Sequence, residues 1–227
     1  MNNDSGDGPR FFAVDLAGHD LGSYEVTGAR AIDWEDIAVG PCPEGSCVFL
    51  GDIGDNRAER ASYVVYRVPE PASVAQGAHE IAGVALPFRY PDGSHDAETL
   101  LVDGAGDIHV VTKGAGSATV YRFPRPHLPG TSATLEKLAT AATPSGSPLV
   151  TAGALAGGRL LLRTYSSVWL YEIGGAGLGG VGQPACMLPA PPEAQGEAIA
   201  WYGDASYLTI GEGRSSAIYR VSCVSLP

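Results

Sequence analysis

The sequence predicts an all-β fold, a β-propeller, from three observations. Gly (31 residues) and Pro (17 residues) interrupt the 227-residue chain throughout, and no segment keeps a helical period. Short apolar runs recur every few tens of residues, as in proteins whose repeat units bury their apolar faces against one another. Three of these runs begin with an acidic segment, and those segments are 33–37, 96–100 and 195–199.

Each unit divides into strands in a constant order. The expected inner strands are 35–39, 98–102, 151–155 and 197–201. The expected second strands, which end in polar or charged residues, are 48–52, 108–113, 160–163 and 207–212. The expected third strands, which each carry an aromatic residue, are 65–68, 120–123, 170–173 and 218–221.

Segment 10–14 resembles a third strand and indicates one more unit, which lacks its inner strand. We therefore expect a five-bladed propeller with an incomplete first blade, forming a single domain over residues 1–227 that is truncated at its N-terminus. The alternative is a four-bladed ring in which 22–26 completes the last blade, because propellers close by pairing strands from both ends of the chain.

Composition limits the partners. Lys and Arg number 14 against 25 Asp and Glu, a formal net charge of −11, which argues against nucleic acid and favours cations. No run approaches the roughly 20 apolar residues of a membrane-spanning helix, so no membrane insertion is expected. The N-terminus shows no signal peptide. We expect a monomer with a small-molecule or glycan ligand.

The cysteines form an even set. Cys42 and Cys47 flank a short loop, and Cys186 and Cys223 lie near the C-terminus. Disulfides 42–47 and 186–223 are expected, with free buried thiols as the alternative. Disulfides favour an extracellular or periplasmic location.

The charges are expected to meet at one end of the ring, because an inner strand begins where the antiparallel second strand ends. Carboxylates gathered there repel one another unless a cation or a basic side chain lies among them. Ca²⁺ or another divalent cation, which prefers oxygen ligands, is the predicted cofactor. The predicted ligands are Glu35, Glu98, Glu197 and Asp52. Thr151 takes the glutamate position in the remaining unit.

Other polar and aromatic residues lie beside these acids. His95 and Asp96 are the predicted catalytic residues, with either as a general base. Lys113 and Arg163 are predicted to bind an anionic substrate group, and Trp34 is a further substrate-binding candidate. The structural alternatives are ion pairs of Lys113 and Arg163 with the acids, and packing of Trp34 in the core.

Two motifs carry a family resemblance, Asp-Trp-Glu-Asp-Ile-Ala at 33–38 and Gly-Asp-Ile-Gly-Asp-Asn at 51–56. With the acidic run at 3–7, they resemble secreted bacterial β-propeller proteins, most of them uncharacterised. The inner strands are more distantly similar to those of phytase-like esterase and lactonase propellers. That resemblance implies a cation at the channel mouth and metal-dependent hydrolysis of esters, lactones or phosphoesters.

Three functions therefore stay open. The first is an extracytoplasmic propeller with a divalent-cation site, acting as a metal-dependent hydrolase. The second is a metal-independent glycoside hydrolase that uses a carboxylate pair. The third is a non-catalytic scaffold that binds a protein or glycan, since propellers host binding and catalysis alike.

Overall fold

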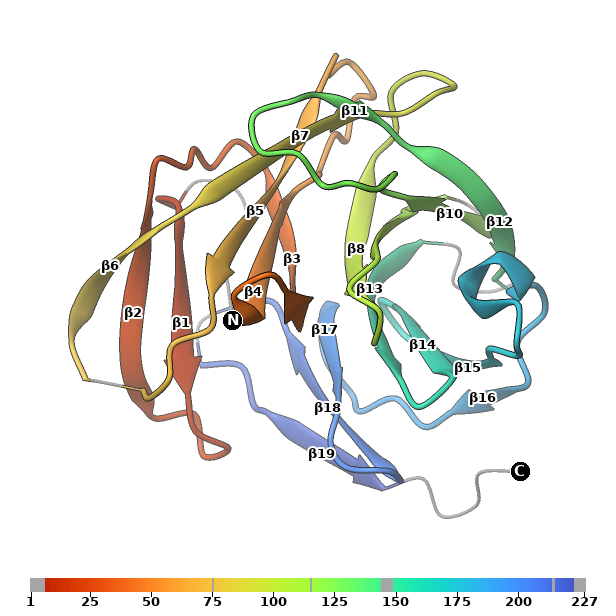
Figure 1. Cartoon of the computed structure of the whole chain (residues 1–227). Coiled ribbons are helices and arrows are strands. Elements are labelled where there is room, and N and C mark those ends of the chain that lie inside the picture. Colours follow the sequence, from red (N-terminus) through yellow and green to blue (C-terminus); the bar gives the residue numbers. More distant parts are fainter. Residues whose placement is uncertain (1–6, 75, 115, 144–148, 214, 223–227) are drawn as a thin grey trace.

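Five β-sheets surround a central axis in the computed structural model of the chain, as Figure 1 shows. The structure describes residues 7–74, 76–114, 116–143, 149–213 and 215–222. Four inner strands line the axis and contact one another in sequence order. They are β3 (Trp34–Cys42), β8 (Ala97–Val102), β13 (Val150–Ala156) and β17 (Gly196–Trp201). The predicted propeller and the predicted positions of these strands are confirmed.

The second and third strands also lie where their sequences predict. The second strands are β4 (Gly45–Asp52), β9 (Ile108–Thr112), β14 (Arg159–Thr164) and β18 (Ser206–Gly211). The third strands are β5 (Tyr63–Pro69), β10 (Ser117–Arg122), β15 (Val168–Glu172) and β19 (Tyr219–Ser222). Outer strands complete blades two to four, and they are β7 (Val84–Arg89), β12 (Glu136–Ala142) and β16 (Cys186–Leu188). All pairs among the strands named so far are antiparallel.

The first blade contains β1 (Arg10–Val14), β2 (Asp20–Thr27) and β6 (Ala78–Ala82), in the order β1-β2-β6. Its described residues provide no counterpart of β3 or β4, which agrees with an incomplete first blade. The four-bladed alternative is wrong, because β2 pairs with β1 and β6 and so belongs to a separate sheet from β19.

Outer strands connect neighbouring blades. The chain leaves β6 in the first blade, passes Gly83 and continues as β7 in the second. A Cβ at Gly83 would run into the Val26 side chain, so the turn between the blades requires a residue without one. In the same way, β11 (Ala133–Thr134) pairs with β7 and is followed by β12 in the third blade. A 3₁₀ helix, η1 (Gly177–Gly180), packs Leu178 against the core between blades.

In blades two to four, the aromatic residue of the third strand is a core residue, whereas Tyr219 in the fifth blade is half-buried. Tyr66, Tyr121 and Tyr171 are almost wholly buried, and each hydroxyl has a partner. Tyr171 donates a hydrogen bond to the Ala142 carbonyl at 2.8 Å, for example. A ring buries a large apolar area while its hydroxyl stays bonded, which explains why this residue type recurs between the blades.

The first predicted disulfide, Cys42–Cys47, is present and closes the β3–β4 hairpin. The second involves Cys223, which lies outside the described residues. Within the described part of the chain, no helix has the length and apolar character needed to cross a membrane.

Candidate functional site

The predicted acidic positions coincide with a repeated backbone irregularity. Each inner strand shifts its pairing register once near its start, between Trp34 and Asp36, Ala97 and Thr99, Val150 and Ala152, or Gly196 and Ala198. The residues at the four shifts are Glu35, Glu98, Thr151 and Glu197. A bulge redirects its side chain relative to the regular pleat. The bulge thus gives all four residues one shared position at the same end of the ring.

Three carboxyl groups meet at this end. Glu35, Asp96 and Glu98 each offer one oxygen, and these oxygens lie within 4.8 Å of one another. We call these three residues the acidic cluster. Glu98 is 5% exposed and Lys113 forms an ion pair with it. The structure therefore brings together two predicted metal ligands, one predicted catalytic residue and one predicted substrate-binding residue.

The electrostatics of the cluster reflect burial and crowding. Burial raises the pKa of Glu98, nearby Asp96 raises it further, and Lys113 opposes both effects. Burial disfavours the charged ammonium of Lys113, but hydrogen bonds to Glu98 and Tyr165 outweigh burial and raise its pKa. One cation thus offsets only part of the charge that three ionised carboxylates would carry.

Glu197 lies close enough to the acidic cluster for the charge of Glu98 to affect its pKa. Burial raises the pKa of Glu197 to about 7, and the charge of Glu98 adds to the shift. Its Oε1 accepts a hydrogen bond from Gln195 at 3.2 Å. In the fourth blade, Thr151 instead donates to the Gly196 carbonyl at 2.6 Å, which ties the fourth and fifth blades together.

The loop after β4 contacts two residues of the acidic cluster, Glu35 and Asp96. A Cβ at Gly54 would overlap the carboxylates of both Glu35 and Asp33, so these two acids close over the glycine. The next residue, Asp55, donates its backbone N–H to Asp96 Oδ1 at 2.7 Å. The Asp55 carboxylate accepts hydrogen bonds from the backbone N–H groups of Glu59 and Arg60 and so stabilises the turn that follows it.

A cleft of about 460 Å³ opens beside the cluster. His95, Asp96 and Lys113 line it, together with Tyr165 and Asn56. The Lys113 ammonium lies 5.8 Å from the centre of the Tyr165 ring. The cleft therefore offers a carboxylate, an ammonium, an imidazole and a phenol to a ligand of small-molecule size.

His95 is held by residues outside the predicted site. Its Nε2 lies 2.9 Å from Asp92 Oδ1 and 3.1 Å from the Tyr121 hydroxyl. Lys137 also pairs with Asp92, at 2.9 Å. Although burial works in the opposite direction, the hydrogen bonds of Lys137, His95 and Tyr121 lower the pKa of Asp92 to about 2. Asp92 is thus an ionised group that orients the imidazole.

Three predicted residues lie away from the cluster. Asp52 is fully buried, pairs with Arg60 at 2.8 Å and accepts from the Asp33 N–H at 3.1 Å. Trp34 is 2% exposed and donates its indole N–H to the Arg30 carbonyl at 2.9 Å, so it is a core residue. Core packing is the structural alternative that the sequence offered for Trp34, whereas the pairing of Asp52 with Arg60 was not expected.

Arg163 is also fully buried. It forms an ion pair with Glu193 and donates to the Ala198 carbonyl at 3.1 Å, so it joins the fourth and fifth blades. The sequence predicts Arg163 as a substrate-binding residue, with the glutamates of the ring as its partners in the structural alternative. The actual partner, Glu193, lies in the loop before β17, a segment that the repeat pattern does not cover.

Sequence reasoning missed Asp92, Tyr121 and Tyr165 as neighbours of the site. The Asp92 to His95 spacing was a usable signal, since an acid three residues from a histidine often meets it in a turn. Nothing local in the sequence relates Tyr165, which follows the fourth blade's second strand, to Lys113 in the third blade.

No protein-family model matches the chain, and no curated protein matches it. Several solved structures are similar in fold. A protein from Lactobacillus plantarum has a TM-score of 0.47 and 12% identity over 86% of this chain, which spans 56% of that protein. The Cps50 (Swd1) β-propeller domain of Myceliophteria thermophila has a TM-score of 0.41 and 9% identity, covering 89% of this chain and 86% of the domain. The PQQ-bound aldose sugar dehydrogenase of Streptomyces coelicolor has a TM-score of 0.43 and 11% identity, covering 97% and 99%.

Proposed function

We propose that this propeller binds a divalent cation, Ca²⁺ first among them, at the acidic cluster, and that it hydrolyses an anionic ester, lactone or phosphoester bound in the adjacent cleft. One observation carries the proposal: oxygens of Glu35, Asp96 and Glu98 lie within 4.8 Å of one another around a point that one ion can reach. Glu197 stands near the cluster as a further oxygen donor, with a pKa that Glu98 raises.

The donor chemistry fits a hard cation. Ca²⁺ takes six to eight oxygen ligands from carboxylates, carbonyls and water, in flexible geometry. Three carboxylates supply a core set and favour an oxygen-seeking ion over zinc, which prefers nitrogen and sulfur. Because Lys113 offsets one carboxylate, the cluster retains negative charge for the ion.

The cleft supplies the remaining parts of a hydrolase. The bound cation would polarise the substrate oxygen and lower the pKa of a water molecule. Lys113 would hold an anionic group of the substrate, since its ammonium lines the cleft. Because Nε2 of His95 faces Asp92, the Nδ1 nitrogen is left to accept a proton, as in other carboxylate-oriented histidines.

Calorimetric titration of the protein with Ca²⁺, Mg²⁺ and Mn²⁺ tests the cation site. We expect Ca²⁺ to bind with one-to-one stoichiometry, and the Glu98→Gln variant to lose at least tenfold in affinity. Glu172→Gln, which alters an exposed residue at the end of β15, should bind like the parent. The cation site is refuted if none of the three ions binds and Glu98→Gln melts at the parent temperature.

Activity is tested with ester, lactone and phosphoester panels in the presence of Ca²⁺. His95→Gln should lose turnover and keep cation binding, because the residue orients a proton acceptor and lies outside the acidic cluster. If His95→Gln turns over substrate at the parent rate, the assignment of the base fails even where the cation site stands.

Extracytoplasmic location belongs to the same proposal. The Cys42–Cys47 disulfide supports it, since such bonds persist in oxidising compartments. A Ca²⁺ site of moderate affinity would be filled outside the cell, where this ion is abundant.

A non-catalytic scaffold is the second candidate, and the Lys113–Glu98 pair favours it. This pair supplies an internal counter-charge within the third blade, as expected of charges that only stabilise the fold. The glycosidase is less well supported. Lys113 lies among the acids, and the cluster oxygens are closer than the 5 to 9.5 Å or so that carboxylate pairs of glycosidases span.

A further inference from the structure

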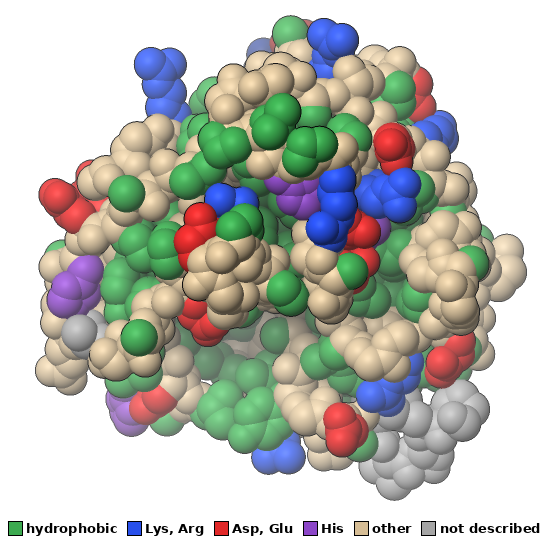
Figure 2. Space-filling model, in the orientation of Figure 1, with side chains coloured by type: hydrophobic (Ala, Val, Ile, Leu, Met, Phe, Trp, Pro, Cys, Tyr) green, Lys and Arg blue, Asp and Glu red, His purple; other side chains and the backbone are tan. Residues whose placement is uncertain are grey.

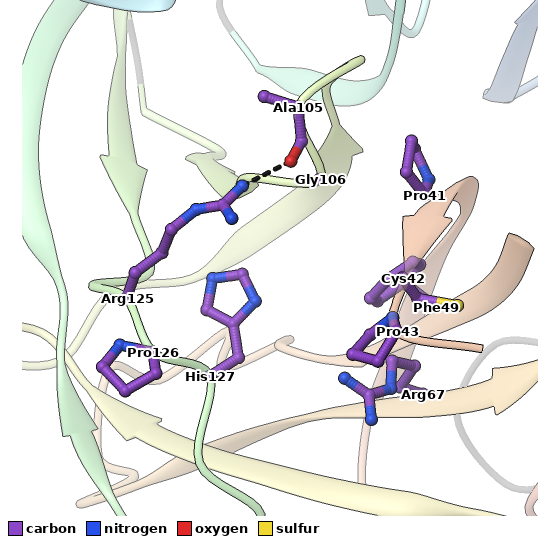
Figure 3. A pocket seen from close by; sticks show the side chains of 10 residues that line it. All are labelled: Pro41, Cys42, Pro43, Phe49, Arg67, Ala105, Gly106, Arg125, Pro126 and His127. Atoms are coloured by element: carbon purple, nitrogen blue, oxygen red, sulfur yellow. Dashed lines mark hydrogen bonds between the residues drawn. The ribbon is translucent and has the colours of Figure 1, made fainter. Parts of the chain in front are cut away.

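A second cavity, of about 660 Å³, lies at the opposite end of the propeller from the acidic cluster. The β3–β4 hairpin, the β8–β9 turn and the segment that follows β10 form its walls (Figure 3). Strand β3 runs from Glu35 near the cluster to Cys42 at this cavity. At about 3.3 Å per residue, the two sites are on the order of 20 Å apart. This cavity is therefore separate from the proposed hydrolytic site.

Three basic side chains from two blades line the cavity. They are Arg67 on β5, and Arg125 and His127 after β10. Arg67 is 7% exposed and its Nη2 lies 3.1 Å from Glu44 Oε1. Arg125 donates to Asp107 and to the Ala105 carbonyl. Since a guanidinium has five N–H donors, each arginine is positioned by its partners and keeps donors for a ligand.

His127 is incompletely satisfied. Its ring lies between the two arginines in Figure 3 and contacts the edge of Phe123, with ring centres 5.8 Å apart. Its Nε2 is buried and has no hydrogen-bond partner among the described residues. Burial lowers the pKa of His127, and the charges of Arg125 and Arg67 lower it further. A buried nitrogen without a partner is costly, and an oxyanion or hydroxyl of a ligand would supply that partner once the ring turns toward the cavity.

The rest of the lining is apolar and rigid. Pro41, Pro43 and Pro126 contribute rings with fixed backbone angles, and Phe49 forms part of the wall. The Cys42–Cys47 disulfide restrains the hairpin that carries the first two prolines. A preformed apolar wall with a few convergent polar groups is typical of small-molecule sites, because little ordering is needed on binding.

We propose that this cavity binds a small organic oxyanion with an apolar body, such as an aromatic carboxylate or sulfonate. The anionic group contacts Arg125, Arg67 and His127, and the apolar body packs against the prolines and Phe49. Basic groups concentrated in one cavity are notable in a chain with a net charge of −11. In Figure 2, basic, acidic and histidine side chains gather above the central hollow of the face that is drawn.

The test uses 2-naphthoate and its neutral analogue 2-naphthylmethanol as probes, titrated calorimetrically into the full chain at neutral pH. The parent should bind 2-naphthoate at least tenfold more tightly than 2-naphthylmethanol, because only the acid can pair with the guanidiniums. Arg125→Gln should weaken 2-naphthoate binding at least fivefold, and so should His127→Ala. Arg89→Gln, which alters an exposed arginine on β7, should leave it unchanged.

Thermal melting of each variant accompanies the titration, so that weakened binding is read only from folded protein. Arg125 has a side chain that is 55% exposed, which makes its variant the safest to fold. The proposal is overturned if 2-naphthoate does not bind, if the alcohol binds as tightly as the acid, or if Arg125→Gln binds 2-naphthoate like the parent. Glu98→Gln should not change the affinity for 2-naphthoate. The anion cavity and the cation site are therefore tested independently of each other.

Discussion

Glu35 and Glu98 occupy the same bulge position in two neighbouring inner strands, and one carboxylate oxygen of each lies within 4.8 Å of the other. Two carboxylates this close repel each other unless a proton, a basic side chain or a cation offsets their charge. The pair is therefore a place where charge is balanced by a proton, by Lys113 or by a cation, and each of these agents can be removed separately.

Replacing Lys113 separates structural from ligand-binding roles. Lys113→Met leaves Glu98, 5% exposed, without its cation. We expect the free energy of unfolding in EDTA to fall by about 3–5 kcal/mol, and the affinity for Ca²⁺ to rise severalfold because one competing charge is gone. Urea denaturation and calorimetry measure the two effects.

Lys137→Met is the matched control, because Lys137 is 52% exposed in its pair with Asp92. A surface pair contributes about 1 kcal/mol or less. If the two lysine variants are equally stable, the Lys113–Glu98 pair does not stabilise the fold. A Ca²⁺ affinity that falls in Lys113→Met would contradict the proposed competition.

Glu197 should make stability depend on pH. Burial raises the pKa of Glu197 to about 7 from an ordinary value of 4.5. Between these values the folded protein binds more protons than the unfolded chain, so this group makes stability fall as pH rises from about 4.5 to 7. In EDTA, Glu197→Gln should raise the melting temperature at pH 8 and leave it nearly unchanged at pH 4.5.

The size of this effect is about 1–2 kcal/mol, since the side chain is only partly buried and solvent screens its charge. At about 2–4 °C per kcal/mol for a chain of this length, the shift is a few degrees. Glu172→Gln, on the exposed end of β15, should show no such pH dependence. Parallel melting curves for parent and Glu197→Gln at both pH values would rule out the shift.

Gly54→Ala probes the shape of the acidic cluster. A methyl group at this position displaces the carboxylates of Glu35 and Asp33, which close over the glycine. We expect Ca²⁺ affinity to fall about 10- to 100-fold, as for other changes behind metal ligands. Gly174→Ala, where the added methyl meets no atom within 4 Å, is the control. Unchanged Ca²⁺ binding in Gly54→Ala would show that Glu35 is not a ligand.

The contact between Arg163 and Gly196 should couple the fourth and fifth blades. A Cβ at Gly196 would overlap the Arg163 guanidinium, which is fully buried beside Glu193. Gly196→Ala should cost about 1–3 kcal/mol through overpacking, and Arg163→Ala about 3–5 kcal/mol through an unpaired buried acid. If the two residues interact, the double variant should lose less unfolding free energy than the sum of the two single losses, by at least about 1 kcal/mol. Additive losses in urea denaturation would mean that the two residues do not interact.

Much of the fold could be predicted because the relevant signals are local. Recurring short apolar runs, three of which begin with an acidic segment, placed the inner strands, and the aromatic residue in each third strand showed where the units repeat. The first blade was harder to interpret. Its outermost strand, β6, comes from a segment some 50 residues after β2, and no local pattern announces a parallel pair between sequence-distant strands.

The site was predictable only in part. Glu35, Glu98, Asp96, Lys113 and His95 do lie near one another, because strands of the same rank begin at the same end of the ring. Asp52 has the correct rank, but Arg60 from its own loop pairs with it. Whether Asp52 pairs with Arg60 or faces the central axis depends on the conformation of the loop after β4, and strand patterns in the sequence do not describe that conformation.

Local patterns in the chain thus determine the all-β class, the order of strands and the end of the ring where acids gather, since strand formation and turn chemistry act over a few residues. Ring closure decides the rest. It selects which carboxylates of neighbouring blades meet, pairs Arg163 with Glu193, and places Arg67 in one cavity with Arg125 and His127, while the third blade's own sheet pairs Lys113 with Glu98. All of these except the Lys113–Glu98 pair involve residues of different blades, so they form only after the blades have packed together.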